Sequence, residues 1–195
     1  MGTRFKLVVG LGNPTAQYEK TRHNAGFWFV DEIAETYGAV FREDRRFQGL
    51  VAALEFGGGS VLLLKPMTFM NRSGQSVAAL VRYYKITAEE MLVAHDELDF
   101  APGVVRLKCG GGHGGHNGLR DLIDQLGTAG FWRIRIGIGH PGNRDEVVPY
   151  VLGNPGANER ELICRAISRV TELFPAILRG ELSAVTTRLH TDSQR

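Results

Sequence analysis

Phe5-Lys6-Leu7-Val8-Val9-Gly10, near the beginning of the sequence, is a short apolar run that ends in a glycine. Such a run is typical of a buried strand. The next apolar segment, Gly26–Tyr37, repeats instead at three- and four-residue spacing and is followed by Gly38. That spacing predicts a helix with the glycine as its stop. A strand followed by a helix is the pattern that the rest of the chain continues.

The remaining segments alternate between the same two patterns. Helical spacing predicts helices over 73–84, 118–126, from residue 158 onward and over 181–189. Strands are predicted over 48–56, 60–65, 91–95, 104–109 and 132–138, the first two joined in a hairpin by three glycines. We therefore expect an α/β fold, a single domain over 1–195 with a twisted mixed, mostly parallel sheet and helices on both faces. Residues 181–195 are expected to form a C-terminal helical segment and tail.

Local residue patterns also predict how some helices begin and end. Asn117 is a natural N-cap for the helix over 118–126. Asn158 opens the long helix, with Glu161 three residues later as in a capping box. Pro175 lies within that helix and is expected to kink it or end it early.

Composition excludes several classes of protein. The chain has 195 residues, a formal net charge of +2 and 43% apolar residues, which suffices for a real core and argues against disorder. Nothing approaches the 18 consecutive apolar residues of a membrane span, and the first residues lack signal-peptide architecture, so we expect a cytoplasmic protein. Cys109 and Cys164 are too few for a disulfide scaffold and are expected to be reduced thiols.

Glycine content and charge distribution indicate a site for an anionic ligand. Glycine supplies 25 of the 195 residues, more than the usual share of about 7%. Residues 100–144 carry six Lys or Arg against two Asp, whereas residues 88–99 carry five acids and neither Lys nor Arg. A cationic region beside an acidic one favours binding of an anion, although solvated faces also produce such runs.

Polar side chains gather at four places where a predicted strand ends near glycines, which is where open α/β sheets place their sites. The segments are Gly10–Asn24, Thr68–Asn71, His95–Asp99 and Gly110–Gly118, with Gly137–Pro141 after the next strand. A histidine backed by a carboxylate forms a general-base pair, and asparagines grip a peptide backbone or stabilise an oxyanion. Because the chain has no Gly-x-Ser-x-Gly elbow and neither cysteine lies in a site loop, water is the favoured nucleophile.

Simpler or different interpretations compete with this one. Asn24, Asn71 and Asn117 each precede a helix, so capping would explain them. The glycines at 110, 112 and 115 match a dinucleotide-binding fingerprint, but the acidic residue expected about twenty positions later is missing. No Gly-Lys pair exists, which excludes a standard P-loop. A metal site is a further alternative, with four candidate ligands: His113, His116, His140 and Asp96.

In their order along the chain, these segments resemble the bacterial-type peptidyl-tRNA hydrolases. The matching motifs are Gly10-Leu-Gly-Asn-Pro14, Tyr18, Thr21-Arg-His-Asn24, Lys65-Pro-Met-Thr-Phe-Met-Asn71-Arg-Ser-Gly74, His95-Asp-Glu-Leu-Asp99, Gly110–Leu119 and Arg135-Ile-Gly-Ile-Gly-His-Pro141. Together they extend from Phe5 to about Gly153. One departure is Thr15, where the family usually has glycine, and the substitution is expected to stiffen or reshape the first loop.

The resemblance implies a monomer without metal or other cofactor that cleaves the ester between a peptidyl group and the 3′-terminal ribose of tRNA. This reaction recycles peptidyl-tRNA dropped by ribosomes. His23 would activate water and Asp96 would orient it, while Lys108 and Arg135 would bind the 5′-phosphate of tRNA. Six further residues would bind the peptidyl end of the substrate or line the site: Asn13, Tyr18, Met70, Asn71, His116 and Asn117.

The residues themselves agree with ester hydrolysis. An ester needs only a water, a base and an oxyanion pocket, and asparagines that contact the peptide main chain would ignore side-chain identity. Cations on a separate patch recognise RNA phosphate without reading bases. The alternative is a module that binds RNA on its basic face and has no catalytic role for His23.

Overall fold

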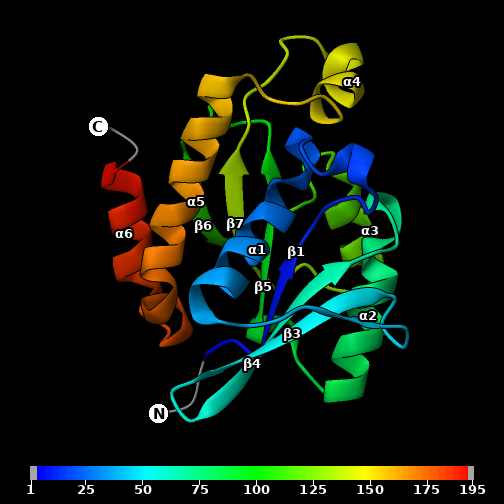
Figure 1. Ribbon diagram of the computed structural model, residues 1–195, viewed down its shortest axis with the longest axis vertical. Coiled ribbons are helices and arrows are strands. Elements are labelled where there is room, and N and C mark those ends of the chain that lie inside the picture. The colour runs from blue at the N-terminus through cyan, green and yellow to red at the C-terminus, as the bar shows by residue number, and fades with distance from the viewer. Residues whose placement is uncertain (1–3, 193–195) are drawn as a thin grey trace.

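The computed structural model describes residues 4–192, and a seven-stranded sheet runs through its centre (Figure 1). The strand order is β2-β3-β4-β1-β5-β7-β6, in which the four neighbours β4, β1, β5 and β7 are parallel. The strands are β1 (Leu7–Gly10), β2 (Arg42–Asp44), β3 (Gly49–Phe56), β4 (Gly59–Pro66), β5 (Met91–Glu97), β6 (Val105–Cys109) and β7 (Trp132–Gly137). Antiparallel pairs lie at both edges, so the sheet is mixed around a parallel centre, as the sequence predicts.

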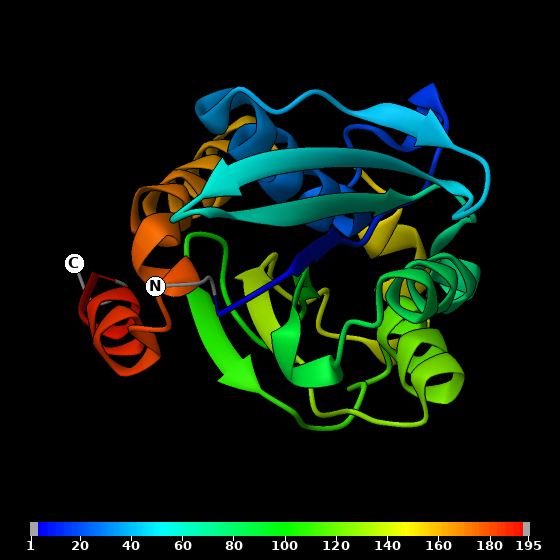
Figure 2. The same cartoon turned by 90° about the horizontal axis from the view of Figure 1, so that it is seen from below.

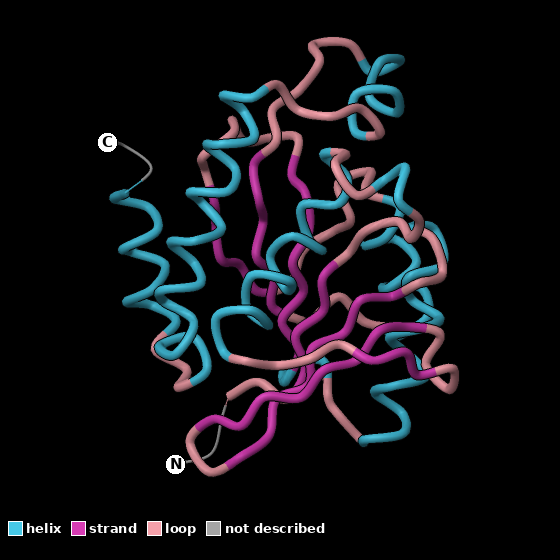
Figure 3. The backbone as a smooth tube through the Cα atoms, in the orientation of Figure 1, coloured by secondary structure: helices cyan, strands magenta, loops and turns pink. Residues whose placement is uncertain are grey.

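Helices cover both faces of the sheet (Figures 2 and 3). They are α1 (Ala25–Tyr37), α2 (Ser73–Tyr84), α3 (Asn117–Leu126), α4 (Val147–Val151), α5 (Ala157–Leu178) and α6 (Leu182–Asp192). Five short 3-10 helices connect them: η1 (Ala16–Tyr18), η2 (Arg22–Asn24), η3 (Met70–Arg72), η4 (Ala88–Glu90) and η5 (Arg144–Glu146). Helices α1 and α5 pack on one face with α6 beyond them, and α2 and α3 pack together on the other.

Each face of the sheet has its own apolar core. One cluster lies under α1, α5 and α6 and includes Phe29, Ile134 and Phe174, none of which is exposed to solvent. The other lies under α2 and α3 and includes Leu80 and Phe131. Buried aliphatic and aromatic side chains each contribute roughly 1.5–3 kcal/mol on transfer from water, so the two clusters hold the layers together.

A contact between two glycines sets the position of the chain around helix α1. A Cβ atom on Gly10 would lie 2.3 Å from the carbonyl oxygen of Gly26, and one on Gly26 would lie 2.4 Å from that of Ala94. Any larger residue at either position would therefore push the helix away from the ends of β1 and β5. The close backbone approach brings η2, which directly precedes α1, to the end of the parallel strands.

Most predicted elements are confirmed. The hairpin, the helix over 73–84, the long C-terminal helix and the strands that surround the site all occur within a few residues of their expected bounds. Strand β2 and helix α4 were not predicted, since three and five residues are too few to establish a period. The segment predicted over 181–189 forms α6, which extends to residue 192, and the tail at 193–195 lies outside the described residues.

The predicted helix caps were wrong in detail. His116, not Asn117, caps α3, because the His116 ring accepts a hydrogen bond from the N–H of Leu119. Helix α5 begins one residue before Asn158, and its capping carboxylate is Glu159, which accepts from the N–H of Gly156 at 3.0 Å.

Asn24 and Asn71, whose simplest explanation was capping, do not act as caps either. No side-chain cap bond is made by Asn24 at the start of α1, and Asn71 lies inside η3.

Pro175 does not end α5 early, which was one of the two expected outcomes. The helix continues to Leu178, although proline lacks the N–H that would bond to the carbonyl of Thr171. That carbonyl instead accepts a hydrogen bond from the hydroxyl of Tyr37 at 3.1 Å. A side chain from α1 thus replaces the missing bond.

Among the helices of residues 4–192, none combines the length and the apolar content of a membrane-spanning segment.

Thr15 occupies a backbone conformation that belongs to glycine. Its φ is 79° and its ψ is 146°, close to a region that residues with a Cβ essentially never adopt. The side chain is exposed, so it gains no packing in return. This explains physically why glycine suits the position and why threonine there strains the loop that follows Asn13.

Replacing Thr15 with glycine should therefore stabilise the protein. Relief of strain of about 1–3 kcal/mol, less the greater flexibility of glycine in the unfolded chain, leaves a gain of about 1 kcal/mol. Urea unfolding measures it as a higher midpoint with an unchanged slope. The matched control is Thr187→Gly in α6, where glycine is the poorer helix former and should lower stability. An unchanged or lower midpoint for Thr15→Gly would show that the loop is not strained.

Candidate active site

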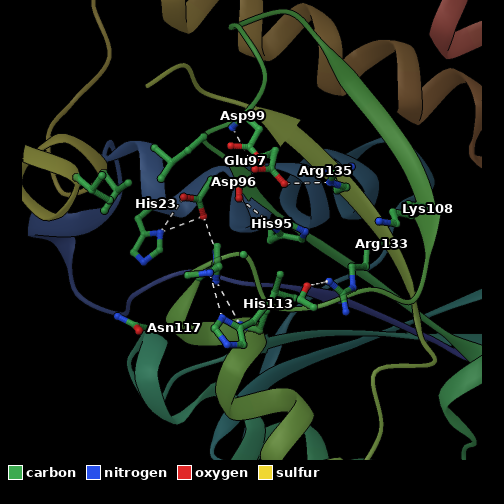
Figure 4. A pocket seen from close by; sticks show the side chains of 18 of the residues that line it. His23, His95, Asp96, Glu97, Asp99, Lys108, His113, Asn117, Arg133 and Arg135 are labelled. Atoms are coloured by element: carbon green, nitrogen blue, oxygen red, sulfur yellow. Dashed lines mark hydrogen bonds and ion pairs between the residues drawn. The ribbon is translucent and has the colours of Figure 1, made fainter. Parts of the chain in front are cut away.

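Three consecutive residues of η2 reach three different parts of the structure. Arg22 extends toward α4 and α5, His23 faces Asp96 on β5, and Asn24 binds the loop after β1. The turn therefore carries the His23 ring to the end of β5 and fixes it there (Figure 4). His23 is 9% exposed and Asp96 is 4% exposed, so their contact is shielded from bulk water.

Asp96 accepts hydrogen bonds from two histidines. The Nδ1 atom of His23 lies 3.0 and 2.9 Å from the two carboxylate oxygens, and Nε2 of His116 lies 2.8 Å from Oδ1. An ionised carboxylate only accepts, so the nitrogen of each ring that faces Asp96 carries the proton. In the neutral His23 ring, Nε2 is therefore unprotonated and turned away from the carboxylate, as a general base requires.

The environment shifts the pKa values of this pair in opposite directions. Burial by itself would lower the pKa of His23, but the charge of Asp96 and the hydrogen bond to it outweigh burial and raise that pKa. Burial opposes ionisation of Asp96, yet His23 and His116 hold the pKa of its carboxyl far below the usual range. Asp96 therefore stays ionised, and a proton gained by His23 is stabilised.

A third histidine, His95, lies beneath this pair. It is 2% exposed, and its Nδ1 lies 2.7 Å from the main-chain oxygen of Asp96. Burial, with a smaller contribution from His116, lowers the pKa of His95 to about 3. The ring therefore remains neutral at physiological pH and supports the backbone of β5 without competing for the proton.

Asn13 is held on three sides by hydrogen bonds. Its N–H donates to Asn24 Oδ1 at 2.8 Å, its carbonyl accepts from Asn24 Nδ2 at 3.0 Å, and its own Oδ1 accepts from the N–H of Met70 at 2.8 Å. The last bond fixes the orientation of the Asn13 amide, leaving the NH₂ group as the end that can donate to a ligand. Met70 itself is buried and packs near Gly118.

The glycine-rich loop before α3 is fastened by a buried arginine. Arg133, 4% exposed, donates from its two terminal nitrogens to the carbonyls of Gly111 and Gly112. The same loop ends in His116, which binds Asp96, and in Asn117, whose Oδ1 accepts from Arg120 at 3.2 Å. Asn117 is exposed and therefore offers its NH₂ group as a donor.

Cations lie on the far side of Asp96 from His23 (Figure 4). Lys108 on β6 is opposite Arg133 on β7, and Arg135 follows two residues later, so all three belong to one face of neighbouring strands. Lys108 is exposed, whereas Arg135 forms an ion pair with Glu97 at 2.9 Å and lies over the ring of Phe100. This arrangement provides a positive surface next to the histidine–carboxylate pair.

The structure brings most of the predicted site residues together. Six of them line one pocket: His23, Asp96, Lys108, His116, Asn117 and Arg135. The other four do not line it. Asn13 is hydrogen-bonded to Met70 and to Asn24, the residue after His23. Tyr18 is half-buried with its ring edge-on to Phe69, and Asn71 is exposed on η3.

The alternative metal set is not assembled. His113 and His140 each accept a hydrogen bond from a loop N–H two residues later, and neither lies with Asp96 in a group of three possible ligands among residues 4–192. His23, Asp96 and His116 do place ligand atoms within 4.8 Å of one another, but they are already hydrogen-bonded together.

Sequence reasoning missed residues that support the site from behind. Arg133 holds the glycine-rich loop, Glu97 holds Arg135, and Arg22 and Asn24 hold η2. Arg22 and Asn24 flank His23 in the motif, which is the one signal that pointed to them. Nothing in the sequence distinguishes Arg133 as the buried arginine from its neighbour at 135.

Comparison with known proteins identifies relatives over nearly the whole chain. Residues 7–195 match the family model described as peptidyl-tRNA hydrolase. The peptidyl-tRNA hydrolase of Neisseria gonorrhoeae is 53% identical over 191 residues, covering 98% of this chain and 100% of that protein. That of Methylococcus capsulatus is 54% identical over 185 residues, covering 95% and 98%. The crystal structure of peptidyl-tRNA hydrolase from Acinetobacter baumannii is 46% identical with a TM-score of 0.92, covering 97% of this chain and 96% of that chain.

The raised pKa of His23 can be tested directly. We expect the His23 ring to titrate in NMR with a midpoint above the ordinary value of about 6.5. In Asp96→Asn the charge that opposes burial is gone, so the midpoint should fall below that value. Asp124→Asn on the exposed side of α3 is the control and should leave the midpoint unchanged. A midpoint that does not move in Asp96→Asn would contradict this account of the pair.

Proposed function

The chain belongs to the peptidyl-tRNA hydrolase family, and we propose that His23 and Asp96 form the general base of its reaction. The protein cleaves the ester between the peptidyl group and the 3′-terminal ribose of peptidyl-tRNA, releasing free tRNA and peptide. The observation that carries the proposal is the geometry of His23, whose Nδ1 is held by a buried ionised carboxylate while Nε2 stays unprotonated. That is the arrangement of a base that accepts a proton from water.

In the proposed reaction, His23 Nε2 takes a proton from a water molecule while the water oxygen attacks the ester carbonyl carbon. Asp96 stabilises the imidazolium that forms. The tetrahedral intermediate then expels the 3′ oxygen of the ribose, which receives the proton from His23. The products are a peptide carboxyl group and a ribose hydroxyl, and no covalent enzyme intermediate is needed.

Asparagine NH₂ groups are proposed to bind the peptidyl end and the developing oxyanion. Asn13 and Asn117 suit this role because their oxygens are engaged by Met70 and Arg120, so the amino groups remain as donors. Donors oriented before the reaction stabilise an oxyanion without reorganisation, and removing one typically costs about 10²–10³ in rate. Asn71, exposed in the middle of η3, would contact the peptide from the other side.

The remaining predicted residues are proposed to shape the binding site. Tyr18, in edge-to-face contact with Phe69, would provide an apolar surface for the peptide, and Met70 would act mainly by orienting Asn13. His116 would keep Asp96 in place as its second hydrogen-bond donor.

Lys108 and Arg135 are proposed to bind the 5′-phosphate of tRNA. They share a pocket with His23, and phosphate contacts position an RNA without reading its bases. A phosphate with two negative charges would compete with Glu97 for the Arg135 guanidinium. We further propose that the protein acts as a single-domain monomer over residues 1–195, in the cytoplasm, on peptidyl-tRNA dropped by ribosomes. A purely RNA-binding role would need the cations but not His23.

Replacing His23 distinguishes a hydrolytic role of the protein from a purely RNA-binding one. His23→Ala should reduce turnover of peptidyl-tRNA by about 10²–10⁴-fold, the usual contribution of a general base, while the protein still folds and keeps much of its tRNA affinity. Its unfolding temperature should fall, because the buried Asp96 carboxylate loses one of its two imidazole donors. His190→Ala on the exposed face of α6 is the matched control and should retain full turnover. A folded His23→Ala protein with a near-normal rate would reject His23 as the base.

The phosphate site can be tested with two substrates. Lys108→Ala or Arg135→Ala should weaken cleavage of peptidyl-tRNA and flatten its salt dependence by about 0.7–0.9 in slope for one lost phosphate contact. Cleavage of a minimal ester without the tRNA body should hardly change. Because both cations would serve one anion, the double variant should lose less than the sum of the single losses. Arg82→Ala on α2 is the control, and equal damage on both substrates would refute the phosphate assignment.

A further inference from the structure

Helix α4 and its flanking loops stand at one end of the molecule, beyond the ends of the strands (Figure 1). Within the helix Val148 is 62% exposed, and Leu152, the residue after the last one of the helix, is 39% exposed. A helix of five residues is not stable by itself, so contacts with the rest of the protein must hold it. Its position matters because Val147, Val148 and Val151 line the same pocket as His23.

The Arg22 side chain supplies several of these contacts at once. Its guanidinium donates to the carbonyl of Tyr150 at 3.2 Å, lies 4.0 Å from the centre of the Tyr150 ring and pairs with Glu159 at 2.7 Å. Its main-chain N–H donates to the carbonyl of Gly153 at 3.0 Å. Only 11% of the side chain is exposed, so these interactions are less screened than those of a surface arginine.

Each partner of Arg22 is itself anchored. Glu159 Oε2 also accepts from the N–H of Gly156 at 3.0 Å, which fixes the carboxylate at the start of α5. The Tyr150 hydroxyl donates to the carbonyl of Ile138 at 2.7 Å, just after β7. Helix α4 is therefore tied to a strand end on one side and to η2 on the other.

We propose that Arg22 is a positioning residue for hydrolysis, which holds the backbone of η2, and with it the His23 ring, in register with the α4 wall of the pocket. Arg22 directly precedes His23, and η2 has only three residues. The Arg22 main chain, which the contacts of its side chain help to hold against α4 and α5, is thus one peptide unit from the main chain of the base. Asp96 fixes one edge of the His23 ring, and Arg22 fixes the main chain from which the ring projects.

This role differs from a contribution to stability alone. A clamp that only added stability would leave the rate per folded molecule unchanged when it was weakened. A clamp that sets the alignment of the base would lower kcat, because a displacement of about 1 Å can cost as much as 10²-fold in rate. It would leave KM nearly constant, since the Arg22 guanidinium contacts Tyr150 and Glu159, whereas the phosphate-binding Arg135 pairs with Glu97.

Two measurements on Arg22→Met, Arg22→Lys and Glu159→Gln test the proposal. Hydrogen exchange of the α4 amides reports whether the clamp holds the helix, independently of any catalytic assignment. Steady-state hydrolysis of peptidyl-tRNA reports kcat and KM, with the unfolding temperature measured for each variant.

For Arg22→Met we expect faster exchange in α4 and a kcat about tenfold lower, with KM within about threefold of the original. Arg22→Lys keeps the charge opposite Glu159 but loses the planar contact with Tyr150. Its kcat and its α4 exchange rate should therefore lie between those of the unmodified protein and those of Arg22→Met. Glu159→Gln, which keeps an acceptor for Gly156, should also give intermediate values of kcat and α4 exchange. Combined with Arg22→Met in a double variant, it should change either value little further. As controls, Arg165→Met and Glu161→Gln alter an exposed ion pair on α5, the helix that carries Glu159, and should change neither kcat nor α4 exchange.

The outcomes separate this proposal from the one on which it rests, namely that His23 is the base. Faster α4 exchange with unchanged kcat would overturn the positioning role, as would unchanged exchange in all three variants. A loss of kcat that follows only from a lower fraction of folded protein would overturn it as well. If His23→Ala remained active, the base assignment would fail, while the exchange measurements would still report on the clamp.

Discussion

The buried carboxylate of Asp96 is the constraint on which the site depends. Removing a carboxylate from water costs several kcal/mol unless hydrogen bonds and nearby charge compensate it. In this protein the compensation comes from two imidazole N–H groups, one on η2 and one on the glycine-rich loop. Both segments must therefore meet at the end of β5, and each of them brings a functional group with it: His23 from one side and Asn117 from the other.

The rest of the fold can be understood as the means of bringing η2 and the glycine-rich loop to that point. The contact between Gly10 and Gly26 lets α1 start directly above the strand ends, and η2 precedes it. On the opposite side, Arg133 binds two carbonyls of the loop, and α3 begins where the His116 ring caps it. His116 therefore links the start of a helix and the ionised Asp96 through the two nitrogens of one ring.

The sequence predicts those parts of this arrangement that depend on periodicity or on a contiguous motif. The strands, the hairpin and the long helices follow from apolar spacing. Several histidines and carboxylates lie near strand ends, and the resemblance to peptidyl-tRNA hydrolases singles out His23 and Asp96 among them. Contacts between distant residues are not visible in that way. Helix α5 tolerates Pro175 because the hydroxyl of Tyr37, 138 positions earlier in the chain, binds the carbonyl that the proline leaves without its helical partner. The same helix is capped by Glu159 rather than Glu161, because it starts before Asn158. The pairing of Arg135 with Glu97 likewise requires two strands to be placed side by side.

That pairing also bears on the chemistry of the base. Asp96 and Glu97 are adjacent, and two arginines lie nearby, but neither arginine binds Asp96 in the described part of the chain: Arg135 pairs with Glu97, and Arg133 binds loop carbonyls. A guanidinium on Asp96 would stay protonated at any physiological pH and would satisfy the carboxylate permanently. An imidazole gains and loses a proton near neutrality. Because Glu97 and the glycine-rich loop engage the arginines, the partners of the Asp96 carboxylate are the two imidazoles of His23 and His116. In the proposed mechanism the carboxylate would stabilise the His23 imidazolium, which forms and disappears in each turnover.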